Sequence, residues 1–188
     1  MTMTPRLQKM MDFIVCVEAR RDAAGNLRVY PLPKADGGGT FEVAGINDRY
    51  HPIQARILRE LVESKRFAQA EAFIREYLAE YTNIVTAWSK VPAIEAFLRD
   101  SAFNRGPKGA LRILQRAVNV ADDGKWGPIT RAAVKAAEAD PRALVRSLRQ
   151  AREAYERRIA PPVGARAKFW KGLQNRWNAA EAFALTLL

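Results

Sequence analysis

The segment of residues 100–130 constrains the fold of this chain more than any other part of the sequence. Gly106 can end one helix and Pro107 can begin the next, because proline fits the first turn of a helix. Apolar side chains then recur at helical spacing and predict one buried stripe, made of Ala110, Leu111, Leu114 and Val118. Asp123-Gly124 predicts a turn, and Gly127-Pro128 predicts the start of another helix. The segment therefore predicts helices joined by tight turns.

Helical spacing of apolar residues continues over most of the chain. The predicted helices span residues 5–20, 53–64, 66–82, 92–100, 107–119, 129–138, 141–159 and 165–188. Glycine-rich turns separate two short β-prone pieces, at 27–30 and 40–43, which predict a small hairpin or irregular β element near residues 25–46. No long linker or internal repeat interrupts this pattern. We therefore predict a single domain over residues 1–188, mainly α, with one small β element.

The composition of the 188-residue chain is that of a globular protein, with 48% apolar and 27% charged residues. No apolar run approaches the roughly 20 residues of a membrane helix, and we recognise no export signal at the N-terminus. The single cysteine, Cys16, excludes an internal disulfide, which suits synthesis in the cytoplasm. Because Cys16 lies in an apolar run, we expect it to be an inert core residue.

Positive charge is concentrated in the second half of the chain. Residues 1–99 carry a net charge of +2, and residues 100–188 carry +9. In the helix predicted for 141–159, we expect four arginines to face outward, namely Arg142, Arg146, Arg149 and Arg152. A basic half attracts a polyanion, which can be nucleic acid, anionic lipid or an acidic polymer of the bacterial envelope. The charge alone does not choose among them.

The motif residues within 100–130 carry a resemblance to a known family. They are Asp100, Ser101, Ala102, Asn104, Gly106, Pro107, Leu114, Gln115, Asp123, Gly124, Gly127 and Thr130. Their spacing resembles that of a family of phage endolysins and bacterial secretion-activator proteins. Those are N-acetylmuramidase-like enzymes of glycoside hydrolase family 108 with a peptidoglycan-binding-like region. The resemblance implies a lysozyme-like fold, with residues 1–100 as the catalytic part and 101–188 as a helical part packed on it.

The same resemblance implies where the chemistry lies. Glycoside hydrolysis usually needs one acid that protonates the leaving oxygen and a second group that activates water or stabilises the cation. Glu18, at the end of the first predicted helix, matches the glutamate of the family and is the candidate general acid. Asp36 and Thr40 belong to a loop that matches the family's Asp-x-Gly-Gly-x-Thr pattern. Either Asp36 or Thr40 with a bound water is the candidate second group.

The chain also departs from the family pattern around these residues. Ala19 and Arg20 follow Glu18, where the family usually has two glycines, and the loop carries extra residues that include Glu42. We predict that Glu42, Tyr50 and Asn104 bind substrate. Simpler structural interpretations remain open: Glu18 can pair with a neighbouring arginine, Asp36 can shape a turn, and Asn104 can cap the turn before the next helix.

Metal and cofactor chemistry finds little support in the sequence. His51 is the only histidine and Cys16 the only cysteine, so neither a histidine cluster nor a zinc site is expected. No nucleophile-elbow motif accompanies His51, which argues against a serine hydrolase triad. We expect no metal and no cofactor.

We therefore expect an endolysin that cleaves the β-1,4 bond between N-acetylmuramic acid and N-acetylglucosamine, for phage host lysis. Its expected partners are peptidoglycan glycan strands, and anionic envelope lipids for the basic half. We expect a monomer that stays in the host cytoplasm until a holin or similar opening releases it. One alternative is a non-catalytic peptidoglycan-binding or secretion-activator-like protein. A basic nucleic-acid-binding protein is the other, although no recognised recognition motif supports it.

Overall fold

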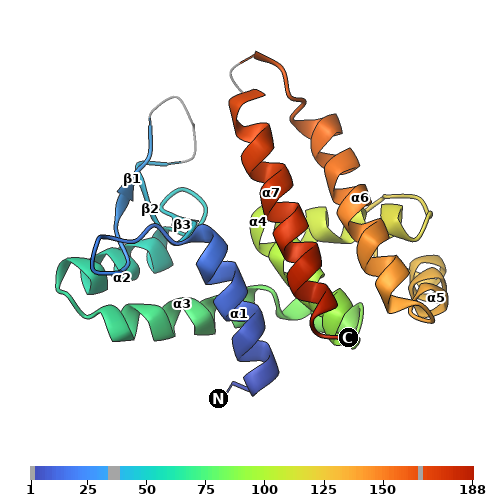
Figure 1. The fold of residues 1–188 in the computed structure, drawn as a ribbon, viewed down its shortest axis with the longest axis horizontal. Helices are drawn as coiled ribbons and strands as arrows, with labels where there is room; N and C mark the ends of the chain where they lie inside the picture. Colours follow the sequence, from blue (N-terminus) through green and yellow to red (C-terminus); the bar gives the residue numbers. More distant parts are fainter. Residues whose placement is uncertain (1–2, 34–38, 165–166) are drawn as a thin grey trace. The chain divides into compact units, whose positions relative to one another are not determined.

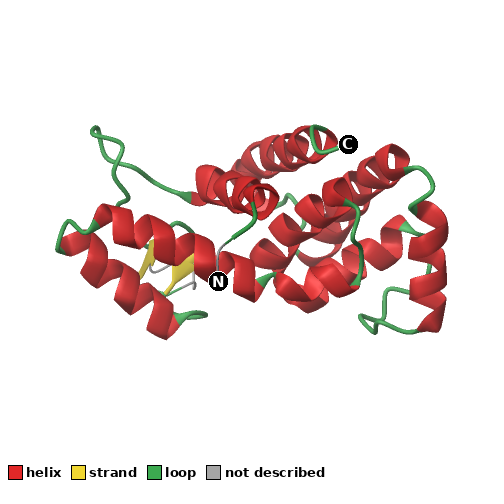
Figure 2. Ribbon diagram, turned by 90° about the horizontal axis from the view of Figure 1, so that it is seen from below, coloured by secondary structure: helices red, strands yellow, loops and turns green. Residues whose placement is uncertain are grey.

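The computed structural model describes residues 3–33, 39–164 and 167–188. Helices dominate these residues, and the strands form one small sheet (Figure 2). The predicted fold class, mainly α with a small β element, is confirmed. The chain divides into two compact units, Met1–Glu80 and Tyr81–Leu188, which we call unit 1 and unit 2. The boundary between the units falls earlier than residue 100, where the sequence analysis placed the end of the catalytic part. The prediction of a single domain over residues 1–188 stays a prediction.

The described part of unit 1 holds helices α1, α2 and α3 and the sheet (Figure 1). Helix α1, Pro5–Glu18, begins where the Thr4 side chain accepts a hydrogen bond from the Leu7 amide at 3.3 Å. Helices α2, Pro52–Glu63, and α3, Phe67–Tyr81, follow the sheet. The sheet is antiparallel, in the order β1 (Tyr30–Pro31), β2 (Phe41–Val43) and β3 (Ile46–Asn47). Its third strand was not predicted.

In unit 1, α2 packs against β2 and β3. An ion pair of 2.6 Å between Asp12 and Arg75 joins α1 to α3. Cys16 is exposed on α1, so its predicted core position is wrong. The apolar run that suggested burial is a helix, and Cys16 lies on a different face from its buried neighbours Ile14 and Val15.

Unit 2 begins with the short 3-10 helix η2, Asn83–Ala87, and continues with four longer helices. They are α4 (Pro92–Ala117), α5 (Pro128–Ala137), α6 (Pro141–Ile159) and α7 (Ala167–Leu185). Helix α4 packs against η2, α6 and α7 (Figure 1). Each of its residues from 93 to 103 is buried. Helix α4 is therefore the central helix of this unit.

The predicted break within α4 is confirmed. Gly106 leaves the helical conformation with φ 70° and ψ 162°, and the helix resumes at Pro107. A positive φ suits glycine because it has no Cβ, and Pro107 loses nothing at the start of a helix because its missing N–H has no intrahelical partner there. Gly106 and Pro107 together produce a kink inside α4.

Candidate functional site

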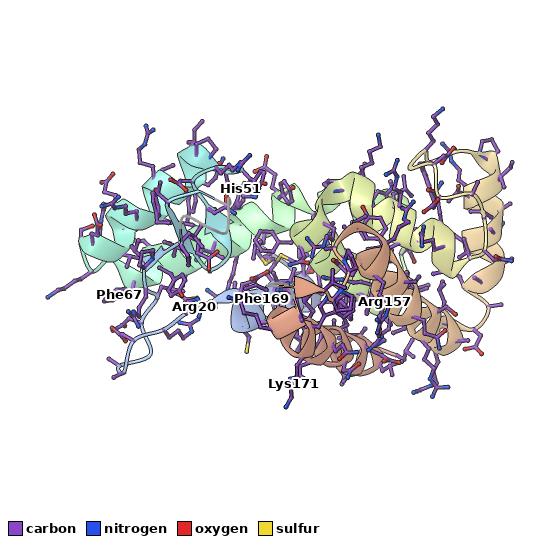
Figure 3. All side chains as sticks on the ribbon, turned by 90° about the horizontal axis from the view of Figure 1, so that it is seen from above. Arg20, His51, Phe67, Arg157, Phe169 and Lys171 are labelled. Atoms are coloured by element: carbon purple, nitrogen blue, oxygen red, sulfur yellow. The ribbon has the colours of Figure 1, made fainter. Side chains whose placement is uncertain are left out.

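The candidate site in unit 1 is a polar cluster on the small sheet, next to the end of α1. On β2, Glu42 lies opposite Tyr30 of β1 and Asn47 of β3. Residues directly opposite in antiparallel strands share one face, so these three side chains are neighbours. The Arg20 guanidinium lies 3.9 Å above the Tyr30 ring and 3.8 Å from the Glu42 carboxylate. Arg20 thus covers the face that holds Glu42, and it is labelled in Figure 3.

Glu18 is the last residue of α1 and is half-buried. The following residue, Ala19, turns to an extended backbone and still donates a hydrogen bond to the Val15 carbonyl at 2.8 Å. Arg20 comes two residues after Glu18, so their Cα atoms lie within about 7 Å. The catalytic role of Glu18 stays a prediction.

Thr40 precedes β2 and is held by Asp48, which the sequence did not single out. The Thr40 hydroxyl donates to one carboxylate oxygen of Asp48 at 2.5 Å, and the Thr40 amide donates to the other at 2.7 Å. The Phe41 amide adds a third bond to Asp48 at 3.3 Å. The hydrogen bond from the Thr40 hydroxyl lowers the pKa of Asp48 below its usual value, aided by these amides. Asp48 is therefore an anion at neutral pH.

The glycine before Thr40 lets the loop approach Asp48 closely. A Cβ on Gly39 would stand 2.2 Å from an Asp48 carboxylate oxygen, and Gly39 has φ +116°. Only glycine fits there without a rearrangement. At Gly39, the group that approaches the backbone closely is therefore the Asp48 side chain. Asp36 lies outside the described residues.

Tyr50 and His51 lie between β3 and α2. The Tyr50 side chain is 66% exposed, and its amide donates to the Asn47 side chain at 3.0 Å. His51 Nδ1 lies 2.6 Å from the Tyr77 hydroxyl of α3, and partial burial lowers the His51 pKa. An exposed aromatic ring such as Tyr50 is the type of group that stacks on a sugar ring, and its substrate-binding role stays a prediction.

Asn104 belongs to unit 2, where it contributes to a buried polar network. Arg152 of α6 is fully buried and donates to Asp100 at 2.6 Å, to Ser101 at 3.0 Å and to Asn104 at 3.0 Å. Arg176 of α7 donates to the second oxygen of Asp100 at 2.7 Å. The Asp-Ser-Ala-Phe-Asn run of the motif thus binds α4 to α6 and α7. A role of Asn104 in binding substrate stays a prediction.

This network corrects the prediction that Arg152 faces outward, because its exposed fraction is 0%. Burial opposes ionisation of Asp100, but the charges of Arg176 and Arg152 outweigh it and lower the Asp100 pKa. Glu156 is also fully buried and pairs with Arg105. The motif that most constrained the fold therefore places paired charges inside unit 2.

The second half of the motif is organised around the buried amide of Gln115. Its side-chain nitrogen donates to Asp123 at 2.7 Å, to the Lys125 carbonyl at 3.1 Å and to Thr130 at 3.1 Å. Its side-chain oxygen accepts from the Gly124 amide at 2.8 Å. One glutamine thereby fixes the loop between α4 and α5. The Gln, Asp-Gly and Thr positions of the motif maintain this loop.

The tryptophans of unit 2 are packing residues rather than an exposed platform for sugars. Trp170 and Trp177 of α7 are 7% and 0% exposed, and their rings meet edge to face at 5.6 Å between centroids. Trp88 is 6% exposed, and its ring centroid lies 6.4 Å from that of Trp126. Such pairs favour the folded state beyond the area that they bury.

Within the described part of the chain, no group of three or more His, Cys, Asp or Glu residues could hold a metal ion. No described helix has the length and apolar character needed to cross a bilayer.

Comparison with known proteins bears mainly on unit 2. Residues 109–178 match a family described as "Predicted Peptidoglycan domain". This match associates the helical second half of the chain with peptidoglycan. A solved structure, that of SagA from Brucella abortus, is 23% identical and covers 96% of this chain and 94% of that chain, with a TM-score of 0.68. That likeness shows a shared fold. A comparison with curated proteins gave no match.

Proposed function

We propose that the chain is a peptidoglycan-cleaving glycosidase of the muramidase type. The observation that carries the proposal is the match of residues 109–178 to a predicted peptidoglycan domain. The acidic and polar residues of unit 1 add the means of catalysis. A glycosidase needs a proton donor and a second group at fixed positions, and Glu18 with the Thr40–Asp48 pair supplies both types of group.

In this mechanism Glu18 protonates the glycosidic oxygen as the bond to it breaks. The Thr40 hydroxyl donates a hydrogen bond to Asp48, so the lone pairs of the Thr40 oxygen remain available to a water molecule. That water attacks the sugar carbon, and its proton passes through the Thr40 hydroxyl to the Asp48 carboxylate, which releases it to solvent after the glycosidic bond has broken. Asp48 orients Thr40 and, as an anion, adds negative potential that favours a cationic transition state. Asp36 is the alternative second group.

The arrangement of Arg20 favours a second candidate, a protein that binds peptidoglycan without cleaving it. Arg20 stands where the resembling family has glycine, and its guanidinium covers Tyr30 and pairs with Glu42. A sugar ring would have to displace this side chain to reach the sheet. An ion pair this exposed contributes about 1 kcal/mol or less, which a substrate can overcome.

Mass spectrometry of the products separates these functions. Purified peptidoglycan sacculi are incubated with the full chain, and the soluble fragments are analysed for their sugar ends. We expect fragments with reducing N-acetylmuramic acid ends. Fragments with anhydro-muramic ends would show that the chain is a lytic transglycosylase and not a hydrolase. Sacculi that bind the chain but release no fragments would establish the non-catalytic candidate.

An enzyme of this type also has to reach the wall, and we propose release through a holin-like membrane opening.

The pairing of Thr40 with Asp48 predicts that the two residues act as one unit. Thr40→Val and Asp48→Asn should each lower kcat/KM for sacculus cleavage, by up to about 100-fold if the water moves by 1 Å. The double variant should be little worse than either single variant, because both changes remove the same interaction.

Asp22→Asn is the matched control, since Asp22 also accepts two backbone amides, from Ala24 and Asn26, in a turn of unit 1. The kcat/KM of Asp22→Asn should stay within about twofold of the wild type, because the turn lies outside the proposed site. Losses for Thr40→Val and Asp48→Asn that multiply in the double variant would refute the shared role.

A further inference from the structure

Three large apolar side chains are exposed among the described residues at the end of α6, just after it and at the start of α7, in unit 2. Ile159 at the end of α6 is 48% exposed, Val163 just after α6 is 66% exposed, and Phe169 in the first turn of α7 is 50% exposed. Apolar residues scattered singly over a surface need no explanation, but a group at one end of two helices does. We call this end of unit 2, with its flanking basic residues Arg158, Lys168 and Lys171, the α6–α7 tip.

Packing between the two helices holds the tip together. The Arg157 guanidinium of α6 lies 4.7 Å from the ring centroid of Trp170 in α7, which is itself buried. Ala160 closes α6 through a hydrogen bond to the Glu156 carbonyl at 2.8 Å, and the Val163 amide donates to the Pro161 carbonyl at 2.8 Å. Ile159 and Phe169 are therefore carried by the ends of two packed helices.

The positive charge of the tip is only partly neutralised. Arg158 pairs with Asp122 at 3.2 Å and remains half exposed. Neither Lys168 nor Lys171 forms an ion pair within the described residues. Lys168 Nζ lies 4.9 Å from the Phe169 ring centroid, so charge and apolar surface are adjacent. Lys171 extends away from the ribbon in Figure 3.

Two of the arginines along α6 are held by partners within unit 2, whereas Arg142 and Arg146 are exposed. Arg149 pairs with Glu153 and donates to Asn178, and Arg152 is buried with Asp100. The sequence assigned the polyanion-binding charge to the whole basic half of the chain. At the α6–α7 tip, exposed basic and exposed apolar side chains are adjacent, as the 4.9 Å between Lys168 Nζ and the Phe169 ring centroid shows.

We propose that the α6–α7 tip binds the surface of an anionic lipid bilayer. Ile159, Val163 and Phe169 enter the boundary between headgroups and acyl chains, as the apolar face of an interfacial segment does. Lys168 and Lys171 remain at the level of the acidic headgroups, because long basic side chains keep their charge in water while their stems lie on apolar surface. An acidic polymer alone would leave the three apolar side chains in water, which favours lipid as the ligand.

Vesicle sedimentation with the full-length chain tests the proposal. We expect binding to vesicles of phosphatidylglycerol and phosphatidylcholine, and little binding to vesicles of phosphatidylcholine alone. Lys168→Glu and Lys171→Glu should each weaken binding to the anionic vesicles about fivefold or more, since each basic residue near the surface contributes that much. Phe169→Ser should weaken it about fivefold because less apolar surface is buried in the bilayer.

Helix α5 offers matched controls for both kinds of change. Ile129 is 77% exposed there, and Lys135 of the same helix is exposed as well. Ile129→Ser and Lys135→Glu should leave vesicle binding within about twofold of the wild type, because a side chain away from the bilayer surface adds little to the attraction. Circular dichroism confirms that each variant is folded.

Three results would overturn the proposal. The first is equal binding to neutral and anionic vesicles. The second is that the α5 variants weaken vesicle binding as much as the tip variants do. The third is unchanged binding of Phe169→Ser, which would mean that charge alone drives the interaction. Cleavage of lipid-free sacculi separates this proposal from the proposed enzymatic function. Tip variants should cleave at the wild-type rate, and abolished cleavage with retained vesicle binding would assign the tip to glycan instead.

Discussion

Replacing Glu18 by glutamine should lower the rate of sacculus cleavage by about 100-fold to 10,000-fold, the range that a positioned general acid contributes. Glutamine keeps the size and hydrogen-bonding capacity of the side chain but has no proton to give to the leaving oxygen. Glu18 is half-buried at the end of α1, so the neutral replacement should be tolerated by the fold. The initial rate of turbidity loss in a sacculus suspension measures the effect.

Glu60→Gln is the control for this substitution. Glu60 is a helical glutamate of α2 whose side chain is 74% exposed and pairs with Arg66 at 3.0 Å. It should cleave at the wild-type rate, and both variants should match the wild type in circular dichroism and thermal midpoint. Full cleavage activity in a folded Glu18→Gln protein would remove Glu18 from the mechanism and leave the proposed function without its acid.

Asp100→Asn should destabilise unit 2 by about 3–5 kcal/mol, the usual consequence of removing one partner from a buried ion pair. Asp100 is fully buried and accepts from Arg152 at 2.6 Å and Arg176 at 2.7 Å. Asparagine would leave two guanidinium groups near one neutral amide at a position that is buried from solvent. Urea unfolding monitored by tryptophan fluorescence measures the effect, because Trp170 and Trp177 report on the same unit.

Asp122→Asn isolates the effect of burial. Asp122 also pairs with two arginines, Arg116 at 2.6 Å and Arg158 at 3.2 Å, but its side chain is 27% exposed. Its replacement should cost about 1 kcal/mol or less. Equal destabilisation in the two variants would show that burial of Asp100 carries no special energetic consequence.

The lowered pKa of Asp100 also sets a pH dependence of stability. A carboxyl with a lower pKa in the folded state than in the unfolded state stabilises the fold above its unfolded pKa of about 3.9. That contribution is lost as the pH falls through the folded-state pKa. The difference in unfolding free energy between the wild type and Asp100→Asn should therefore be constant near neutral pH and shrink under strongly acidic conditions.

The sequence predicted the helices well, because the residues that start a helix, such as a capping side chain followed by proline, act on their immediate neighbours. The helix predicted for 141–159 is α6, Pro141–Ile159, with Asp140 accepting from the Ala143 amide at its start. The break at Gly106 and Pro107 was predicted for the same reason, since backbone geometry at these two residue types depends little on tertiary context. Strand β3 was missed because two residues carry no periodicity.

Long-range partners could not be predicted. The spacing of Arg152 on α6 suggested an outward position, but Asp100, a residue 52 positions earlier, pairs with it in the interior. Asp48 was likewise overlooked, because only the closed loop reveals that it binds Thr40. Of the predicted site residues in unit 1, Thr40 and Glu42 lie on or beside β2, and Glu18 is the last residue of α1. The catalytic assignments among them stay predictions.

The position of Asp100 has a consequence for the order of events during synthesis. Helix α4 is made first, but the arginines that neutralise Asp100 follow 52 and 76 residues later. On the ribosome, the central helix therefore emerges with its carboxylate unpaired and its apolar surface uncovered. Unit 1 has its own ion pair between α1 and α3, 63 residues apart, completed before unit 2 begins. Unit 2 completes its buried core only when α7 has been translated, because α7 packs against α4 and α6 and supplies Arg176 to Asp100.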